Sequence, residues 1–107
     1  MSSTGVLVVT TMLDDEAAAR ELAAAVVEER LAACAQVGGP LHSVYRWQGS
    51  VESATEWSVA MKTSSGALER LLERVRSLHG YETPELVVTE VVGGDPDYLA
   101  WVVDETT

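Results

Sequence analysis

The chain has 107 residues, the length of one domain over residues 1–107, and its hydrophobic residues, 47% of the total, include no Phe. Its formal net charge of −10 argues against nucleic acid and anionic membrane surfaces as partners, because both attract positive charge. A single cysteine excludes an internal disulfide, and no stretch reaches the roughly 18 apolar residues of a membrane span or resembles a signal peptide, so we expect a cytoplasmic protein.

A strand and a helix are predicted before residue 34. Residues 6–9 form a run rich in β-branched side chains, which is typical of a central strand. Asp14 is expected to cap the helix that follows, which should extend to about Arg30. That segment is amphipathic, because one helical face carries Ala18, Leu22, Ala25 and Val26.

A long β-hairpin is the most informative feature of the sequence. Its first arm, Cys34–Trp47, would reach about 45 Å at about 3.3 Å per residue, and residues 51–63 return after a turn at 48–50. A compact domain of this length is about 35 Å across, so the tip should project beyond it. The tip carries Tyr45 and Trp47, which are costly to leave in water. We therefore expect another chain to cover the tip in an oligomer.

The remaining elements follow from turn residues and periodicity. Residues 38–40, Gly-Gly-Pro, predict a bulge or bend in the first arm of the hairpin. A second helix is expected from Ser64-Ser65-Gly66 to His79, with Gly80 in the left-handed position after its end. Its apolar stripe consists of Leu68, Leu71, Leu72, Val75 and Leu78. Residues 85–92 predict a fourth strand, and residues 97–104 a short terminal helix with Tyr98, Trp101 and Val102 facing inward.

The order βαββαβ with a C-terminal helix predicts an α+β, ferredoxin-like fold. Two crossovers around a hairpin place four antiparallel strands in one sheet, with both long helices on the same face. The other face of the sheet then needs a cover that one chain does not supply. This is a second reason to expect association of subunits.

Few residues in the chain suggest metal chemistry, and none has a recognised ligand spacing. Cys34 is either a small buried hydrophobic residue or a metal or redox ligand. His79 either favours the helix C-terminus electrostatically or converges with Tyr81 and Glu82 on a cleft, where the three could ligate a cation or handle a proton. A site shared between chains is compatible with both readings.

Two basic residues have structural and functional interpretations. Lys62 is either a solvated strand end or a positive charge in a pocket between subunits. Arg46 is expected to form an ion pair with one of the many carboxylates. Because no nucleophile elbow, phosphate loop or Ser/His/Asp arrangement is present in the sequence, we expect no enzymatic activity.

Five segments of the sequence resemble the CutA divalent-cation tolerance proteins, in the same order along the chain. They are Glu28-Glu29-Arg30-Leu31-Ala32-Ala33-Cys34, Ser43-Val44-Tyr45-Arg46-Trp47-Gln48-Gly49, Lys62-Thr63, His79-Gly80-Tyr81-Glu82-Thr83-Pro84-Glu85 and Tyr98-Leu99-Ala100-Trp101-Val102. The resemblance implies a ferredoxin-like protomer in a tight homotrimer similar to the PII signalling proteins. It also implies a link to copper and other divalent cations, and a bacterial cytoplasmic location.

The resemblance also implies where functional residues cluster. Positions that recur together in the family correspond to Tyr45, Trp47, Lys62, His79, Tyr81, Glu82 and Trp101, and the family cysteine corresponds to Cys34. Three positions depart from the family pattern. Gly80 replaces a Pro, Gln36 replaces an Asn, and Gln48 replaces a Glu that is often present.

Two functional hypotheses follow. The first is a trimeric protein that binds or responds to divalent copper or another divalent cation, with Cys34, His79 and Glu82 as metal ligands. The alternative is a PII-like signalling or scaffold trimer that binds a small anionic ligand or a protein tail in a cleft between subunits. The residues expected to line that cleft are Tyr45, Trp47, Lys62, Tyr81, Glu82 and Trp101.

Overall fold

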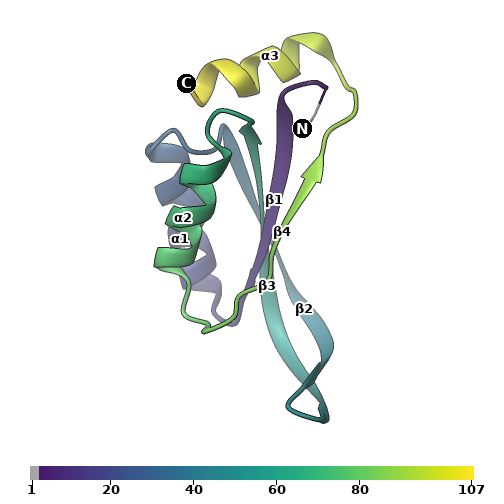
Figure 1. The fold of residues 1–107 in the computed structure, drawn as a ribbon. Coiled ribbons are helices and arrows are strands. Elements are labelled where there is room, and N and C mark those ends of the chain that lie inside the picture. The colour runs from purple at the N-terminus through teal and green to yellow at the C-terminus, as the bar shows by residue number, and fades with distance from the viewer. Residues whose placement is uncertain (1–2) are drawn as a thin grey trace.

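The computed structural model describes residues 3–107, so the first two residues of the predicted domain lie outside it. The elements are β1 (Val6–Leu13), α1 (Glu16–Glu28), β2 (Cys34–Trp47), β3 (Ser50–Ser64), α2 (Leu68–Leu78), β4 (Leu86–Glu90) and α3 (Pro96–Glu105). The predicted α+β class and the order βαββαβ with a C-terminal helix are confirmed (Figure 1). Within the described residues no helix has the length and apolar character needed to cross a membrane.

One antiparallel sheet organises the fold. Its strands lie in the order β2-β3-β1-β4, with Val9 opposite Met61 in the central pair. Helices α1 and α2 cover the same face of this sheet, as predicted (Figure 1). The core lies between them, where the side chains of Val26 and Leu71 are fully buried together with those of Val9 and Met61. Small aliphatic side chains thus allow two helices to pack closely on a sheet without any Phe.

Helix α3 lies across one end of the sheet rather than on the face covered by α1 and α2 (Figure 1). Its Val102 is fully buried and packs with Val6 and Ala33. The prediction that Tyr98 and Trp101 also face inward was wrong, because these side chains are 43% and 41% exposed. Their rings contact each other with centroids 5.6 Å apart, and the hydroxyl of Tyr98 lies 3.4 Å from the thiol of Cys34 at the start of β2. A short helix over a sheet end buries only one narrow stripe.

The β2–β3 hairpin extends well beyond the rest of the chain, as predicted (Figure 1). The principal extents are 44 × 25 × 22 Å. A two-residue turn closes the tip, because Trp47 pairs with Ser50 and the intervening Gln48 and Gly49 have φ values of 48° and 84°. Positive φ at both positions is typical of a type I′ turn, which matches the twist of the strands. The predicted bulge is also confirmed as a register shift between Gly38 and Leu41.

The ends of the two long helices differ from the predictions. Asp15, not Asp14, caps α1, and its carboxylate accepts a hydrogen bond of 2.8 Å from the backbone N–H of Ala18. Helix α1 ends at Glu28, and Arg30 then takes a left-handed φ of 61°. These shifts are small because periodicity locates the body of a helix better than its ends.

Helix α2 is shorter than predicted at its N-terminal end. Ser64 still belongs to β3, and the helix begins at Leu68 after a turn. At the other end, Gly80 is not among the residues with a positive φ, so its predicted left-handed conformation was wrong. His79 follows the helix in an extended conformation instead, with φ −80° and ψ 140°. The side chain of His79 organises the following loop, as described below.

Candidate functional site

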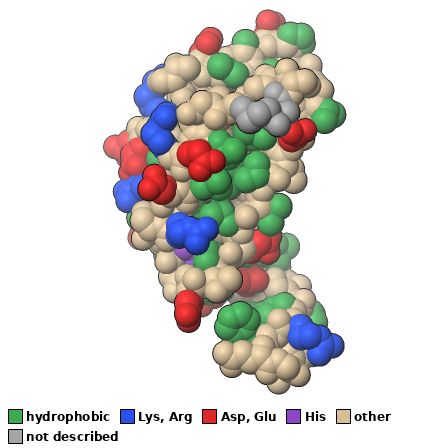
Figure 2. Space-filling view, viewed as in Figure 1, with side chains coloured by type: hydrophobic (Ala, Val, Ile, Leu, Met, Phe, Trp, Pro, Cys, Tyr) green, Lys and Arg blue, Asp and Glu red, His purple; other side chains and the backbone are tan. Residues whose placement is uncertain are grey.

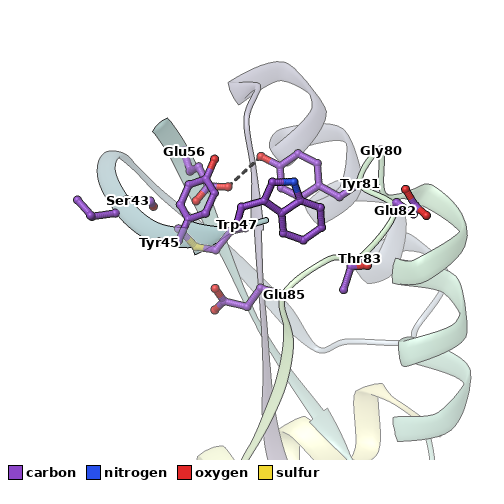
Figure 3. A pocket seen from close by; sticks show the side chains of 11 residues that line it. Ser43, Tyr45, Trp47, Glu56, Gly80, Tyr81, Glu82, Thr83 and Glu85 are labelled. Atoms are coloured by element: carbon purple, nitrogen blue, oxygen red, sulfur yellow. Dashed lines mark hydrogen bonds between the residues drawn. The ribbon is translucent and has the colours of Figure 1, made fainter. Parts of the chain in front are cut away.

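A groove of about 650 Å³ lies between the hairpin and the loop of residues 79–85. Its lining combines residues from β1, β2 and β3 with residues of that loop, several of which Figure 3 labels. The lining residues are Met12, Ser43, Val44, Tyr45, Trp47, Glu56, Gly80, Tyr81, Glu82, Thr83 and Glu85. The groove is therefore built from segments that are far apart in the sequence, with aromatic and acidic side chains as its main features.

A tyrosine–carboxylate pair lies in this groove. The hydroxyl of Tyr81 donates a hydrogen bond of 2.8 Å to Oε2 of Glu56 (Figure 3). Glu56 is 9% exposed, so its carboxylate has little access to water. Burial raises the pKa of Tyr81 well above its usual value, and the bond to Glu56 raises this pKa further. Tyr81 therefore remains a neutral hydrogen-bond donor at physiological pH.

We expect Tyr81→Phe to destabilise the chain at neutral pH. The substitution leaves a mostly buried carboxylate without its donor, which costs about 1–3 kcal/mol. The pKa of Tyr81 is raised in the folded state, so this group stabilises the fold below its unfolded pKa of about 10 and loses that contribution as the pH rises further. The free energy of unfolding should therefore fall more steeply above pH 10 in the wild type than in the variant. Urea unfolding at several pH values measures this difference.

Tyrosinate absorbance provides an independent readout of the same pair. Burial and the Glu56 bond predict that the difference between the wild-type and Tyr81→Phe titrations rises only well above pH 10. The difference is needed because the pKa of Tyr98 is also raised, mainly by its hydrogen bond to Cys34. A difference curve centred near pH 10, as in an unfolded peptide, would contradict the buried pair.

His79 holds the loop rather than lining the groove. One ring nitrogen, Nε2, lies 2.7 Å from the carbonyl oxygen of Met12, and the other, Nδ1, accepts a hydrogen bond of 3.1 Å from the backbone N–H of Tyr81. These contacts are those of a neutral imidazole that donates from Nε2 and accepts at Nδ1. The ring of His79 also contacts that of Tyr81, with centroids 4.8 Å apart. His79 thus attaches the loop to β1 and positions Tyr81.

The residues predicted for the cleft divide into two groups. Tyr45, Trp47, Tyr81 and Glu82 line the groove. Lys62 does not line it, and its Nζ donates a hydrogen bond to the side chain of Gln36. The second group, Lys62 and Trp101, lies near α3. Lys62 pairs with Cys34 between β2 and β3, and the thiol of Cys34 is 3.4 Å from the hydroxyl of Tyr98. The ring of Tyr98 in turn contacts that of Trp101.

The predicted metal ligands do not come together in one chain. Cys34 pairs with Lys62, which pairs with Val8, whereas His79 contacts Met12 at the other end of β1. Val8 and Met12 are four residues apart in β1, which corresponds to about 13 Å along the strand. Two ligands of one metal ion lie within about 4 Å of each other, so Cys34 and His79 of the same chain are too far apart to share an ion. Among residues 3–107, no three side chains of His, Cys, Asp or Glu gather in a way that suits a metal ion.

Glu56, Glu85 and Met12 line the groove but were missed as site residues in the sequence. Glu56 alternates with Trp57 along β3 and therefore looked like an ordinary polar position of a strand. Its burial depends on Tyr81, which lies 25 residues further along the chain. No local signal separates Glu56 from Glu52, an exposed carboxylate of the same strand.

Comparison with known sequences identifies one family. The sequence model described as CutA1 divalent ion tolerance protein matches residues 6–105. The divalent-cation tolerance protein CutA of Thermus thermophilus is 44% identical over 80 residues, which are 75% of this chain and 78% of that protein. The chloroplastic protein CutA of Arabidopsis thaliana is 39% identical over 80 residues, or 75% of this chain and 44% of its own length.

Solved structures of the same family match the fold over nearly the whole chain. The divalent cation tolerance protein of Thermus thermophilus has a TM-score of 0.92 at 41% identity, covering 95% of this chain and 99% of that chain. The CutA structure from Xylella fastidiosa has a TM-score of 0.93 at 32% identity, covering 96% of this chain and 99% of that chain. Sequence and three-dimensional shape therefore lead to the same assignment.

Proposed function

The chain belongs to the CutA1 divalent ion tolerance family, and from this premise we propose that it takes part in the cytoplasmic response to divalent cations, copper among them. The observation that carries the proposal is the match of the family over residues 6–105. The formal net charge of −10 is compatible with a cationic ligand. The family is named for tolerance and not for a reaction, and we propose a role in binding rather than in catalysis.

We further propose that the working form is a homotrimer. The hairpin tip supports association, because Val44, Trp47 and Val51 are 50–65% exposed in the isolated chain. Hydrophobic side chains are also visible on part of the projecting tip and along the body of the molecule (Figure 2). Strand β4 and the residues after it add a second exposed apolar strip, with Val87 and Val92 at 47% and 83%. Two such surfaces in one small chain favour contact between copies.

For the metal, the contacts favour Cys34 over His79 as a ligand. Cys34 is only partly buried, and within the described residues its thiol has one hydrogen-bonding neighbour, the hydroxyl of Tyr98. Both ring nitrogens of His79 already have partners in the chain, so binding a metal there would break one of these contacts. Glu82 is exposed on the loop and has a carboxylate that a hard cation prefers.

Calorimetric titration with Cu²⁺, and in parallel with redox-inert Zn²⁺, tests the metal proposal. We expect Cys34→Ser to weaken binding about tenfold or more, since even residues behind a metal ligand cost that much when removed. His79→Ala should lower thermal stability through its lost contacts but change metal affinity less. The third variant, Glu82→Gln, removes the negative charge of the third proposed ligand. Equal, weak affinity in the wild type and all three variants would exclude these residues as metal ligands.

A second proposal is that the protein acts as a signalling or scaffold trimer with a small ligand in its groove. The groove favours this role, because a volume of about 650 Å³ is in the range of sites for small organic molecules. Tyr45, Trp47, Tyr81 and Glu82, which the sequence predicts for a cleft between subunits, line it in the single chain. Screening small ligands by thermal shift in the absence of metal tests this role separately from copper binding.

A further inference from the structure

We propose that the bulge of β2, residues 38–40, orients the outer hairpin, residues 41–56, relative to the sheet, and that copies of the chain assemble only in this orientation. The inference rests on the proposed homotrimer and deepens it. It concerns the geometry that brings the exposed tip to a second copy of this chain, rather than the side chains that make the contact.

The bulge lies where the hairpin leaves the rest of the chain. The ladder between β1 and β3 ends at the pair of Leu13 and Trp57, and the register shift between Gly38 and Leu41 falls opposite the same Trp57. Beyond this point, within the described residues, β3 pairs with β2 alone, and the two strands twist about each other (Figure 1). A β-bulge bends its strand and increases the local twist. A bend at this position therefore turns the outer hairpin as a unit.

The bulge accounts for one extra residue in β2. Val37 pairs with Val59 in the core, and Trp47 pairs with Ser50 at the tip. Between these two pairs β2 takes ten residue steps and β3 takes nine. Deleting one residue of the bulge would make the two strands equal, so both pairs and the faces of the side chains in the outer hairpin would be retained. The extra residue is thus not needed to pair the strands or to place Trp47 on its face.

Packing at the bulge holds it in one geometry. Trp57 packs against the core, and its ring also lies against the backbone of Gly39, where an added Cβ would be 2.7 Å from Cδ1 of the ring. The hydroxyl of Ser58 donates a hydrogen bond of 3.4 Å to the carbonyl oxygen of Gly38. Close packing of this kind resists continuous deformation, so the outer hairpin leaves the sheet at one angle.

A small change of direction at the bulge moves the tip far enough to break an interface. The segment from Leu41 to Trp47 spans about 23 Å, at about 3.3 Å per residue. A change of about 10° at the bulge therefore displaces Trp47 by about 4 Å. A gap of about 1 Å already removes up to about half of the attraction between packed atoms. The exposed side chains of the tip are therefore sufficient for assembly only when the bulge orients them.

Deletion of Pro40 removes the bulge and tests its role in assembly. Gly39 then faces Trp57 alone, and it has no Cβ to overlap with that ring. NMR contacts between Tyr45 and Glu52 should show that the outer hairpin remains paired. In sedimentation velocity over a series of protein concentrations, the oligomer of the variant should dissociate at a concentration at least about tenfold higher than that of the wild type.

Spin-label distances measure the direction of the outer hairpin separately from assembly. Labels are placed through Ser50→Cys at the tip, paired with Glu69→Cys on α2 or with Asp97→Cys on α3, three exposed positions. The native cysteine is replaced by Ser, and labelled chains are co-refolded with an excess of unlabelled chain, so that only distances within one chain contribute. Deletion of Pro40 should shift at least one of the two mean distances by about 4 Å or more.

Gly39→Ala provides a second variant in case the deletion prevents folding. Because its Cβ overlaps with Trp57, it should shift the same distances by a smaller amount and weaken assembly. Gly66→Ala is the matched control, since its Cβ meets nothing within 4 Å, and it should change neither the distances nor the assembly.

The proposal is overturned if the folded deletion variant keeps both distances, or if it changes them and still assembles like the wild type. If the deletion variant does not fold, unchanged distances or wild-type assembly in Gly39→Ala overturns the proposal in the same way. A monomeric wild-type chain would overturn the homotrimer, and with it the role of the bulge in assembly. The distances would still distinguish that failure from a bulge that does not set the direction of the hairpin.

Discussion

Replacing Trp47 with Ala should dissociate the oligomer while each chain remains folded. Trp47 is the last residue of β2 and is 50% exposed in the single chain, so its removal takes little from the core. If a neighbouring subunit covers this side chain, truncating it costs about 3–5 kcal/mol at each interface. Sedimentation velocity over a range of protein concentrations should then show smaller species in the variant, with an unchanged far-UV circular dichroism spectrum.

Two variants control this experiment. Trp47→Phe keeps a large aromatic side chain and should preserve most of the assembly. Leu78→Ala removes an apolar side chain that is 39% exposed at the end of α2, on the helical side of the sheet, and should leave the assembly intact. An intact oligomer of unchanged stability in Trp47→Ala, or a wild-type chain that sediments as a monomer at micromolar concentration, would contradict the proposed role of the tip.

Replacing Gly39 with Ala should destabilise the fold by about 2–4 kcal/mol, because steric overlap and backbone strain add. A Cβ at this position would lie 2.7 Å from Cδ1 of Trp57 and 3.0 Å from the carbonyl oxygen of Glu56. In addition, Gly39 has a φ of 142°, which residues with a side chain rarely adopt. Urea unfolding at a fixed protein concentration measures the loss.

This substitution also tests the link between the bulge and the groove. Relief of the overlap would move Trp57 or the backbone of Glu56, so Tyr81 should lose part of its contact with that carboxylate. Gly66→Ala is the matched control, because a Cβ there meets nothing within 4 Å and Gly66 is not among the residues with positive φ. It should change stability by less than about 0.5 kcal/mol. Similar losses in both variants would contradict the steric argument.

The site was only partly predictable from the sequence. Tyr45 and Trp47 were recognisable because large aromatic residues at the end of a long hairpin are costly to expose. Tyr81 and Glu82 were recognisable because they belong to a short loop after a helix. Glu56 was not, since its local sequence does not distinguish it from Glu52, an exposed carboxylate of the same strand. The pairing of Glu56 with Tyr81 is a contact between distant segments.

His79 shows that residue type alone does not predict the role of a side chain. Its residue type predicted a ligand or a proton-transfer group, whereas its two ring nitrogens bond to Met12 and Tyr81 and hold the loop. Cys34 and His79 were both assigned to a metal site, yet the register of the sheet places them near opposite ends of β1. Residue type indicates what a side chain is able to do, and register determines what it meets.

The sequence by itself determined the order of strands and helices, the length of the hairpin, the turn at its tip and the apolar face of α2. These features depend on periodicity and on turn residues, which act within a few positions of the chain. Only the tertiary structure decided that an acidic groove forms beneath the hairpin, that Lys62 lies outside it and that Glu56 is buried against Tyr81. The physical reason is that these contacts depend on strand register and on a bulge at Gly39, which bring together residues that no local pattern connects.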